Sequence, residues 1–368
     1  MDQTTCLHPT RIFDGHVLHQ GCIMVSRGRV TAILDTVPAG LVPHVLHGTL
    51  TPGYLDLQVN GGGDVFLNTS PTPDAMAAIA AAHRGFGTTG ILPTLITDAP
   101  EVLDRAADAA LAAQGQPGIL GLHIEGPHLS LARRGTHAAR YLRPLDARTI
   151  GVVQRLRLGD VPVMITVAPE ATTQGQIAAL TETGAVVSIG HSDTNSAQVR
   201  AALAEGATCF THLFNAMSPM LNRSAGVTGA CINSTAYAGI ICDGVHVADE
   251  MIALALRARP RADTTFLVSD AMPTVGGSDR FSLYGDEIRL QNGRLVNAEG
   301  SLAGAHVTMA ESVARLINVI GLDPASALRM ATTIPAKVIG LPNGLIGQRI
   351  EDLLLLDANW NVHTTGIA

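Results

Sequence analysis

The feature that most constrains the fold of this chain is an alternation through its middle section. Short apolar runs of strand length alternate with alanine-rich amphipathic stretches such as PDAMAAIAAAHRGFG and SAQVRAALAEG. Parallel strands joined by crossover helices produce this pattern, because helices cover both faces of the sheet. Eight such runs predict a (β/α)8 barrel of the TIM type, an α/β fold. The runs are 50–59, 89–96, 118–124, 161–168, 185–190, 206–211, 237–242 and 264–269.

A doubly wound open sheet is the competing architecture. Its nucleotide-binding versions carry a GxGxxG motif after a strand, or a Walker lysine. The sequence has neither feature, and Lys337 is the only lysine in the 368 residues. The barrel is therefore the favoured prediction.

The two ends of the chain differ from the middle. Residues 1–48 alternate in polarity with tight turns, and the stretch GQRIEDLLLLDANWNV near the other end is also strand-like. We expect the two ends to pair into one small β-sandwich domain formed by residues 1–48 and 340–368, with the barrel at 49–339.

The segment after the eighth apolar run, FSLYGDEIRLQNGRLVNAEGSLAG, has the pattern of a β-hairpin. An Asn-Gly pair is the strongest short-range signal for a tight hairpin turn. The sequence therefore predicts a turn at Asn292 and Gly293.

The charge and the apolar pattern restrict the partners and the location. The formal net charge is -7, whereas nucleic acid and anionic membranes attract basic surfaces. The N-terminus lacks a cationic start followed by an apolar core, and no run is long enough for a membrane helix. The five cysteines form no CxxC pair. We therefore expect a cytoplasmic protein that binds neither nucleic acid nor membrane.

Polar residues stand where several predicted strands end. Glu125 ends the third run, His191 follows the fifth, His212 the sixth and Asp270 the eighth. In a barrel the carboxyl ends of all strands meet at one face, which is where active sites lie. We expect these four side chains to lie close together.

The chemistry of these four residues is that of a metal-dependent hydrolase. One glutamate and two histidines bind a divalent metal and leave a position open for water. An aspartate facing that water suits a general base. A single histidine at a strand end is more often a hydrogen-bonded core residue than a ligand, but four such residues on four strands favour the metal interpretation.

Seven motifs, in the same order, resemble those of the N-acetylglucosamine-6-phosphate deacetylase family of the amidohydrolase superfamily. The resemblance extends from about residue 10 to residue 357 and implies a barrel with a small β domain built from both chain ends. It also implies hydrolysis of the acetamide of N-acetylglucosamine 6-phosphate to glucosamine 6-phosphate and acetate. The motifs are TPGYLDLQVNGGGDVFLN, GLHIEGPHLSLARRGTH, VSIGHSDT, GATCFTHLFNAMSPM, CDGVHV, LVSDAM and GSLAGAHVTM.

The resemblance also implies roles for individual residues. Glu125, His191 and His212 correspond to the metal ligands, and Asp270 to the acid/base. In the family an arginine and a histidine that hold the sugar phosphate can come from the neighbouring subunit, which implies a homodimer. The residues that correspond to substrate contacts are Thr136, His137, Asn215, Ala216, Arg223, His246, Leu302, Ala303 and Gly304.

Two departures from common amidohydrolase patterns bear on the metal. Many relatives carry His-x-His at the end of the first strand, where this chain has Gln58 and Asn60. Many binuclear relatives also bridge two metals with a carboxylated lysine, and Lys337 lies beyond the last barrel strand. Because neutral amides are poor zinc ligands, we expect one divalent metal per subunit. Zinc is the expected ion, with iron, manganese and cobalt as alternatives.

Three alternatives to this function remain open. The same chemistry on N-acetylgalactosamine 6-phosphate differs only in the configuration at C4 of the sugar. A different amidohydrolase acting on another N-acyl substrate is disfavoured by the FNAM and DGVHV motifs. A non-enzymatic metal-bearing scaffold would be expected to lose Asp270 or a metal ligand, and all are present.

Overall fold

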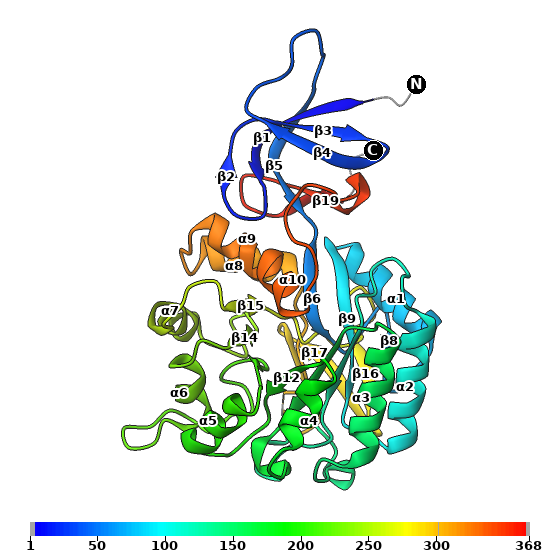
Figure 1. Cartoon of the computed structure of the whole chain (residues 1–368), viewed down its shortest axis with the longest axis vertical. Coiled ribbons are helices and arrows are strands. Elements are labelled where there is room, and N and C mark those ends of the chain that lie inside the picture. The colour runs from blue at the N-terminus through cyan, green and yellow to red at the C-terminus, as the bar shows by residue number, and fades with distance from the viewer. Residues whose placement is uncertain (1–3, 301, 366–368) are drawn as a thin grey trace.

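The computed structural model describes residues 4–300 and 302–365. A barrel and a small β domain lie at opposite ends of the molecule, joined by β5 (His44–Pro52) and by the segment after the last helix (Figure 1). The predicted α/β architecture is confirmed.

Eight parallel strands of the described chain form the barrel, and their order in the sheet follows their order in the sequence. Each predicted run overlaps one of them, although β9 begins one residue before its run and β10 ends one residue after its run. Between the first and last strands, the backbone N–H of Asp270 donates to the carbonyl of Gln58 at 3.0 Å, which nearly closes the barrel. The strands are β6 (Tyr54–Val59), β9 (Thr88–Ile96), β10 (Leu122–Glu125), β11 (Val163–Val167), β12 (Val186–Ile189), β13 (Cys209–Phe210), β14 (Tyr237–Ile240) and β15 (Thr265–Leu267).

The first predicted run, 50–59, is divided between the two sheets. β5 continues to Pro52 in the small domain, and β6 begins at Tyr54 in the barrel. The division falls at Gly53, where a Cβ would lie 2.1 Å from the Thr89 hydroxyl oxygen. Only a residue without a side chain fits where the chain passes from one sheet to the other.

The helices cover the outside of the barrel, as the amphipathic stretches predict. Several begin at a side chain that accepts from the first turn: Thr72 accepts from the backbone of Ala75, and Thr308 forms a capping box with Glu311. The helices are α1 (Pro73–Arg84), α2 (Pro100–Ala112), α3 (Ala147–Leu158), α4 (Gln176–Glu182), α5 (Ser196–Ala204), α6 (Gly226–Ile232), α7 (Asp249–Ala258), α8 (Met309–Asn318), α9 (Pro324–Ala331) and α10 (Thr333–Val338), with short 3-10 turns η1 (Leu131–Arg133), η2 (Ala139–Tyr141), η3 (Pro169–Ala171) and η4 (Ile350–Asp352).

Strands from both chain ends form one separate mixed sheet, as predicted. β19 (Leu353–Leu356) pairs antiparallel with β5, so that Leu355 lies opposite Leu50. An apolar cluster that includes Ile12, Ile23 and Leu353 is buried within this domain. The strands besides β5 are β1 (Thr5–Phe13), β2 (Leu18–His19), β3 (Cys22–Ser26), β4 (Arg29–Leu34), β19 (Leu353–Leu356) and β20 (Val362–Thr365).

A three-stranded antiparallel sheet follows the last barrel strand. It consists of β16 (Arg280–Leu283), β17 (Asp286–Gln291) and β18 (Arg294–Val296). The predicted turn between the last two strands is confirmed: Asn292 and Gly293 have φ values of 51° and 75°, which a two-residue hairpin turn requires. A two-stranded ribbon, β7 (Gly61–Gly62) and β8 (Val65–Phe66), lies after β6.

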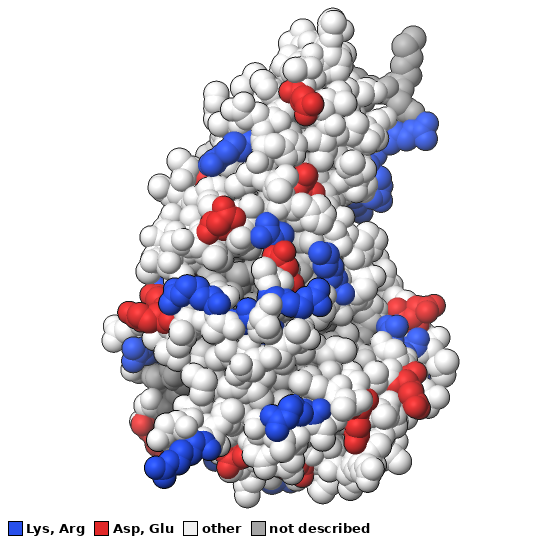
Figure 2. Space-filling view, turned by 60° about the vertical axis from the view of Figure 1, so that its left-hand side comes forward, with Lys and Arg blue, Asp and Glu red and all other residues white. Residues whose placement is uncertain are grey.

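The charged residues are distributed without separation of sign on the face drawn in Figure 2. Basic and acidic side chains of the described residues lie interspersed there over a largely uncharged surface. None of the helices within residues 4–300 and 302–365 combines the length and the apolar character needed to cross a membrane.

Candidate active site

The four polar residues expected at the barrel mouth come from the carboxyl ends of four strands. Glu125 is the last residue of β10, and His191, His212 and Asp270 follow β12, β13 and β15 within three residues. The last three have positive φ values of 47°, 30° and 52°. Non-glycine residues adopt this conformation at a cost of the order of 1 kcal/mol or more, and such strain clusters at functional sites.

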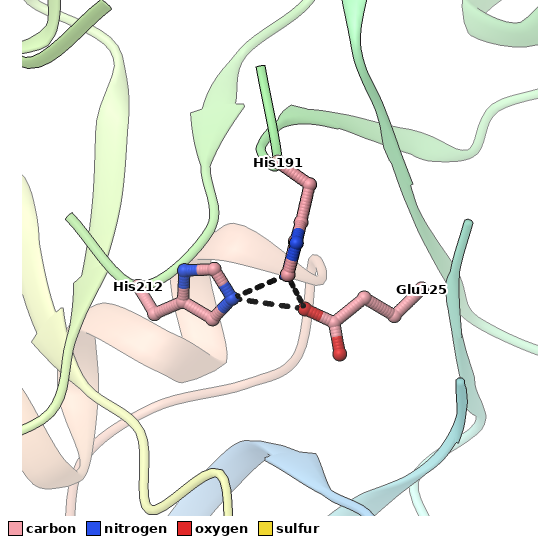
Figure 3. Close-up of side chains that lie close together, drawn as sticks. All are labelled: Glu125, His191 and His212. Atoms are coloured by element: carbon pink, nitrogen blue, oxygen red, sulfur yellow. Dashed lines mark hydrogen bonds and ion pairs between the residues drawn. The ribbon is translucent and has the colours of Figure 1, made fainter. Parts of the chain in front are cut away.

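The ligand atoms of Glu125, His191 and His212 converge on one point. Glu125 Oε1 lies 3.2 Å from His191 Nε2 and 3.0 Å from His212 Nε2, and the two Nε2 atoms are 3.0 Å apart (Figure 3). All three side chains are buried, with at most 5% of their surface exposed. Among the described residues, these three form a group whose side-chain ligand atoms lie close enough together to hold one metal ion.

Hydrogen bonding supports a metal at this point. Nδ1 of His191 donates to the Arg133 carbonyl at 2.9 Å, which leaves an Nε2 lone pair facing the cluster. That lone pair faces Nε2 of His212 and an oxygen of Glu125. The three atoms are electron-rich and would repel one another without a cation between them. Two imidazole nitrogens and a carboxylate in such contact match the ligand set of a divalent cation.

The electrostatics of the cluster favour ionised Glu125. Burial alone raises the pKa of this carboxyl group, but the close approach of His191 and His212 to its oxygen holds the pKa well below its usual range. For His212, burial lowers the pKa and the Glu125 carboxylate more than compensates, so that the net direction is upward. The site therefore keeps a negative charge facing the two imidazoles.

Asp270 is held next to the cluster by two amide side chains. Gln58 Nε2 donates to Asp270 Oδ1 at 3.1 Å and to Glu125 Oε1 at 3.0 Å, and Asn60 Nδ2 donates to Asp270 Oδ1 at 2.7 Å. Both contacts use Oδ1, and Oδ2 has no hydrogen bond among the described residues. Burial, together with the charge of Glu125, raises the pKa of Asp270 to about 6. A carboxylate with a raised pKa and one free oxygen suits proton transfer near neutral pH.

His137 forms another wall of the same site. Its ring packs edge-on against that of His191, with centroids 4.4 Å apart. Its Nδ1 faces Thr97, 2.7 Å from the hydroxyl oxygen and 3.3 Å from the backbone nitrogen. Burial, with the nearby His191, lowers the pKa of His137 to about 3, so the ring is neutral at pH 7.

A cavity of about 180 Å³ opens over the cluster. Most of the residues singled out from the sequence line it, including both Thr136 and His137. Ile96, Ile241 and Met272 add apolar surface. The predicted site residues that line it are Glu125, Thr136, His137, His191, His212, Asn215, Ala216, His246, Asp270, Leu302 and Gly304.

Two predicted site residues do not line the cavity. Ala303 is buried, with 3% exposure, between two neighbours that do line it. Arg223 is exposed at the tip of a tight turn in which Leu221 and Ser224 pair. The loop that carries it, between β13 and α6, projects from the barrel (Figure 1). Arg223 therefore lies outside the cavity of its own chain.

Two of the cavity residues have features expected of ligand contacts. His246 Nδ1 lies 2.6 Å from Oδ2 of Asp243, which fixes the ring and leaves Nε2 for the cavity. The amide nitrogen of Asn215 is buried without a hydrogen-bond partner in the described structure. Because buried donors are rarely left unpaired, this atom is available to a substrate.

Sequence reasoning missed three residues of the site. Thr97 and Asp243 were not singled out as polar partners, and Gln58 was weighed only as a metal ligand. Thr97 directly follows β9, so the rule that identified the other strand-end residues could have found it. His128, the second histidine of the motif GLHIEGPHLSLARRGTH, bonds to the Arg143 carbonyl and to the Thr149 hydroxyl and is not among the residues that line the cavity.

Comparisons with known proteins agree with this geometry. Residues 49–348 match the amidohydrolase family. An N-acetylgalactosamine-6-phosphate deacetylase from Shewanella sp. (strain ANA-3) is 39% identical over 89% of this chain and 85% of its own length. An N-acetylglucosamine-6-phosphate deacetylase from Haemophilus influenzae is 33% identical over 94% of this chain and 93% of its own.

Solved structures give the same result. The N-acetylglucosamine-6-phosphate deacetylase of Pasteurella multocida superposes with a TM-score of 0.91 at 31% identity, covering 99% of this chain and 98% of that one. The enzyme of Mycobacterium smegmatis, in complex with N-acetyl-D-glucosamine-6-phosphate, superposes with a TM-score of 0.89 at 31% identity, covering 98% and 97%. The chain belongs to the amidohydrolase family, alongside the amino-sugar-6-phosphate deacetylases that it resembles.

Proposed function

We propose that this protein hydrolyses the acetamide of N-acetyl-D-glucosamine 6-phosphate, releasing acetate and D-glucosamine 6-phosphate. The observation that carries the proposal is the convergence of Glu125, His191 and His212 beside Asp270 within one cavity. The Haemophilus influenzae relative and the Mycobacterium smegmatis complex support the choice of this sugar phosphate.

Glu125, His191 and His212 would hold one divalent metal, for which zinc is the expected ion. When bound, such a metal supplies a Lewis acid and lowers the pKa of a water molecule toward neutrality. Gln58 and Asn60 turn their amide nitrogens toward the Glu125 and Asp270 carboxylates. Because an amide nitrogen is a donor and not a ligand, this arrangement supports one metal rather than two.

Asp270 transfers the protons of the reaction. Its carboxylate accepts a proton from the attacking water, whose oxygen forms the new bond to the acetamide carbonyl carbon. Asp270 then returns the proton to the departing nitrogen as the C–N bond breaks, leaving the amine and acetic acid, which ionises to acetate at neutral pH. Its contacts with Gln58 and Asn60 hold Oδ1, so Oδ2 is the oxygen available for both transfers.

His137 stabilises the charge that develops on the carbonyl oxygen. Its Nδ1 is turned away toward Thr97, so Nε2 is the ring nitrogen that serves the cavity. A neutral ring that donates from a buried position costs little reorganisation when the oxygen becomes negative.

The phosphate of the substrate needs positive charge, and none of the described residues that line this cavity is an arginine. Arg223 lies on a projecting loop beside Met220 and Leu221, which are 46% and 60% exposed. We therefore propose a homodimer in which this loop covers apolar surface of the partner and carries Arg223 to its cavity. There the guanidinium and His246 would bind the phosphate, the arginine in bidentate fashion.

A second substrate has its own supporting observation. The Shewanella relative, at 39% identity, is an N-acetylgalactosamine-6-phosphate deacetylase. The chemistry of the site is the same for this sugar, because only the configuration at C4 differs.

The test is acetate release by metal-analysed protein from both sugar phosphates and from unphosphorylated N-acetylglucosamine. Faster turnover of N-acetylglucosamine 6-phosphate is the expected result. Preference for the galacto sugar would keep the mechanism and replace the substrate. Absence of acetate from all three, with one metal bound per chain, would overturn the proposed function.

A further inference from the structure

Thr97 lies at the junction of two parts of the site. It is the residue after β9, and only 1% of its surface is exposed. Its hydroxyl oxygen lies 2.7 Å from His137 Nδ1 and 3.4 Å from the Glu125 carbonyl oxygen, and its backbone nitrogen lies 3.3 Å from the same Nδ1. The residue therefore contacts both the strand that carries Glu125 and the ring of His137.

The two contacts to Nδ1 determine which nitrogen of His137 carries the proton. A backbone N–H can only donate, so Nδ1 must accept from Thr97. The hydroxyl group has one proton, and its oxygen lies closer to Nδ1, at 2.7 Å, than to the Glu125 carbonyl oxygen, at 3.4 Å, so it donates to the same nitrogen. A neutral imidazole has one protonated nitrogen, and with Nδ1 as the acceptor the proton is on Nε2.

We propose that Thr97 is a positioning residue that holds His137 in the tautomer with its proton on Nε2. In that tautomer the ring donates a hydrogen bond to the substrate carbonyl. In the opposite tautomer Nε2 would present a lone pair to the carbonyl oxygen, and N–H groups of His137 and Thr97 would face each other. This inference rests on the proposed function for the role of His137, but the tautomer is independent of it.

The surroundings of Thr97 hold it in place. Gly126 has a φ of 83°, and a Cβ there would lie 2.4 Å from the Thr97 hydroxyl oxygen, so glycine leaves the room that this oxygen fills. The hydroxyl of Tyr284, which lies in the turn between β16 and β17, donates to the Thr97 carbonyl. Asn68 bonds to both backbone groups of Ile96, at 3.1 Å and 2.9 Å. Contacts from three separate segments thus fix the donor that orients His137.

The first test compares three variants in the deacetylation assay. Thr97→Val keeps the shape and removes the hydroxyl group, and kcat should fall by about 10- to 100-fold, the usual range for partners that orient site residues, with a smaller change in KM. Thr97→Ser restores the hydroxyl group and should recover most of the rate. Thr88→Val, on the same strand, removes a buried hydroxyl without a partner in the described structure and should leave kcat unchanged.

The second test reads the tautomer directly, in the wild-type protein. Nitrogen-15 NMR of labelled histidine distinguishes protonated from unprotonated ring nitrogens, and loss of a signal in His137→Ala assigns the ring. We expect an unprotonated Nδ1 and a protonated Nε2 at pH 7. In Thr97→Val the Nδ1-protonated form should gain population.

The outcomes separate this inference from the proposed function. A wild-type His137 protonated on Nδ1, or a Thr97→Val variant with unchanged kcat and unchanged tautomer, would overturn the positioning role. If wild-type protein hydrolyses none of the acetamido sugars, the proposed function fails, while the NMR measurement still decides the tautomer. A Thr97→Val variant that does not fold leaves the wild-type spectrum as the deciding result.

Discussion

Three histidines around the cavity are held in the same way. In each, Nδ1 contacts another protein group, and Nε2 remains available to a metal or a substrate. The Arg133 carbonyl binds Nδ1 of His191, Thr97 binds that of His137, and the Asp243 carboxylate binds that of His246. A second hydrogen bond of this kind fixes both the orientation and the protonation of an imidazole. Hydrogen bonds of single residues therefore determine which ring nitrogens are available for chemistry.

Replacement of Asp270 by asparagine tests the proton-transfer role. The change removes the basic oxygen and keeps the shape, so kcat should fall by at least about 100-fold, the lower end of the usual contribution of general acid–base catalysis. Metal content per chain should not change, because Asp270 is not among the three converging ligands. Steady-state rates and elemental analysis are the measurements, with the exposed Asp286→Asn as the control. A variant with a near-normal rate would refute the assignment.

Asp56 predicts a pH dependence of stability. Burial raises the pKa of this carboxyl group from 3.8 to about 7, although the backbone N–H groups of Gln58 and Ser269 donate to it. The folded state therefore holds a proton that the unfolded state has lost, and the free energy of unfolding should fall as the pH rises from about 4 to 7. The shift corresponds to an upper limit of about 4 kcal/mol.

Chemical denaturation of the wild type and of Asp56→Asn at several pH values between 5 and 8 measures this effect. The asparagine side chain cannot ionise, so its free energy of unfolding should vary less over this range. Asp286→Asn, at an exposed position, should follow the wild type. Parallel curves for the wild type and Asp56→Asn would show that Asp56 does not titrate there.

At the scale of elements, the site depends on how each strand ends. Three of the four central residues follow their strands in a left-handed conformation, and all three line the cavity. The third strand instead ends on its ligand, Glu125, and turns at Gly126. The strands thus place the four residues at one end of the barrel, and the residues that follow three of the strands adopt the unfavourable backbone conformation.

Two glycine substitutions separate a required glycine from a tolerated one. At Gly126 a Cβ would approach the Thr97 hydroxyl to 2.4 Å with φ at 83°, so Gly126→Ala should destabilise the fold by more than about 1 kcal/mol and lower kcat. Gly151 lies inside α3, where a Cβ meets no atom within 4 Å, so Gly151→Ala should stabilise by about 0.5–1 kcal/mol. Thermal and chemical unfolding give both values, and equal effects would contradict the geometry.

At the scale of the whole molecule, no arginine is among the described residues that line the cavity, whereas a phosphate would require positive charge there. Arg223 is exposed and does not line the cavity of its own chain, so the phosphate-binding role proposed for it needs a second copy of the chain. Under this proposal, replacement of Arg223 inactivates the active site of the partner subunit, whereas replacement of Asp270 inactivates the active site of the chain that carries the replacement.

Complementation tests this arrangement. Arg223→Ala and Asp270→Asn should each be nearly inactive on the sugar phosphate. When the two proteins are unfolded together and refolded as mixed dimers, one site per mixed dimer contains both residues, so activity should return to roughly a quarter of the wild-type value. Each variant refolded alone is the control. No recovery, with mixed dimers present on a native mass spectrum, would place Arg223 in its own site or outside any site.

The sequence by itself determined the architecture and the centre of the site. Periodicity of apolar residues is a local property, so each of the eight runs indicated its strand, and the Asn292-Gly293 pair indicated its turn. The strand ends of a barrel meet at one face whatever the details of packing. Glu125, His191, His212 and Asp270 could therefore be grouped before their distances were known.

Only the tertiary structure decided which partners these residues have. Gln58 bonds to Asp270, 212 residues away, and Thr97 bonds to His137, 40 residues away. The structure also divided the run 50–59 at Gly53 and placed Arg223 outside its own cavity. A hydrogen bond depends on distances of a few tenths of an ångström between segments that no sequence period relates. For this reason the tautomer of His137 and the free oxygen of Asp270 follow from the folded chain alone.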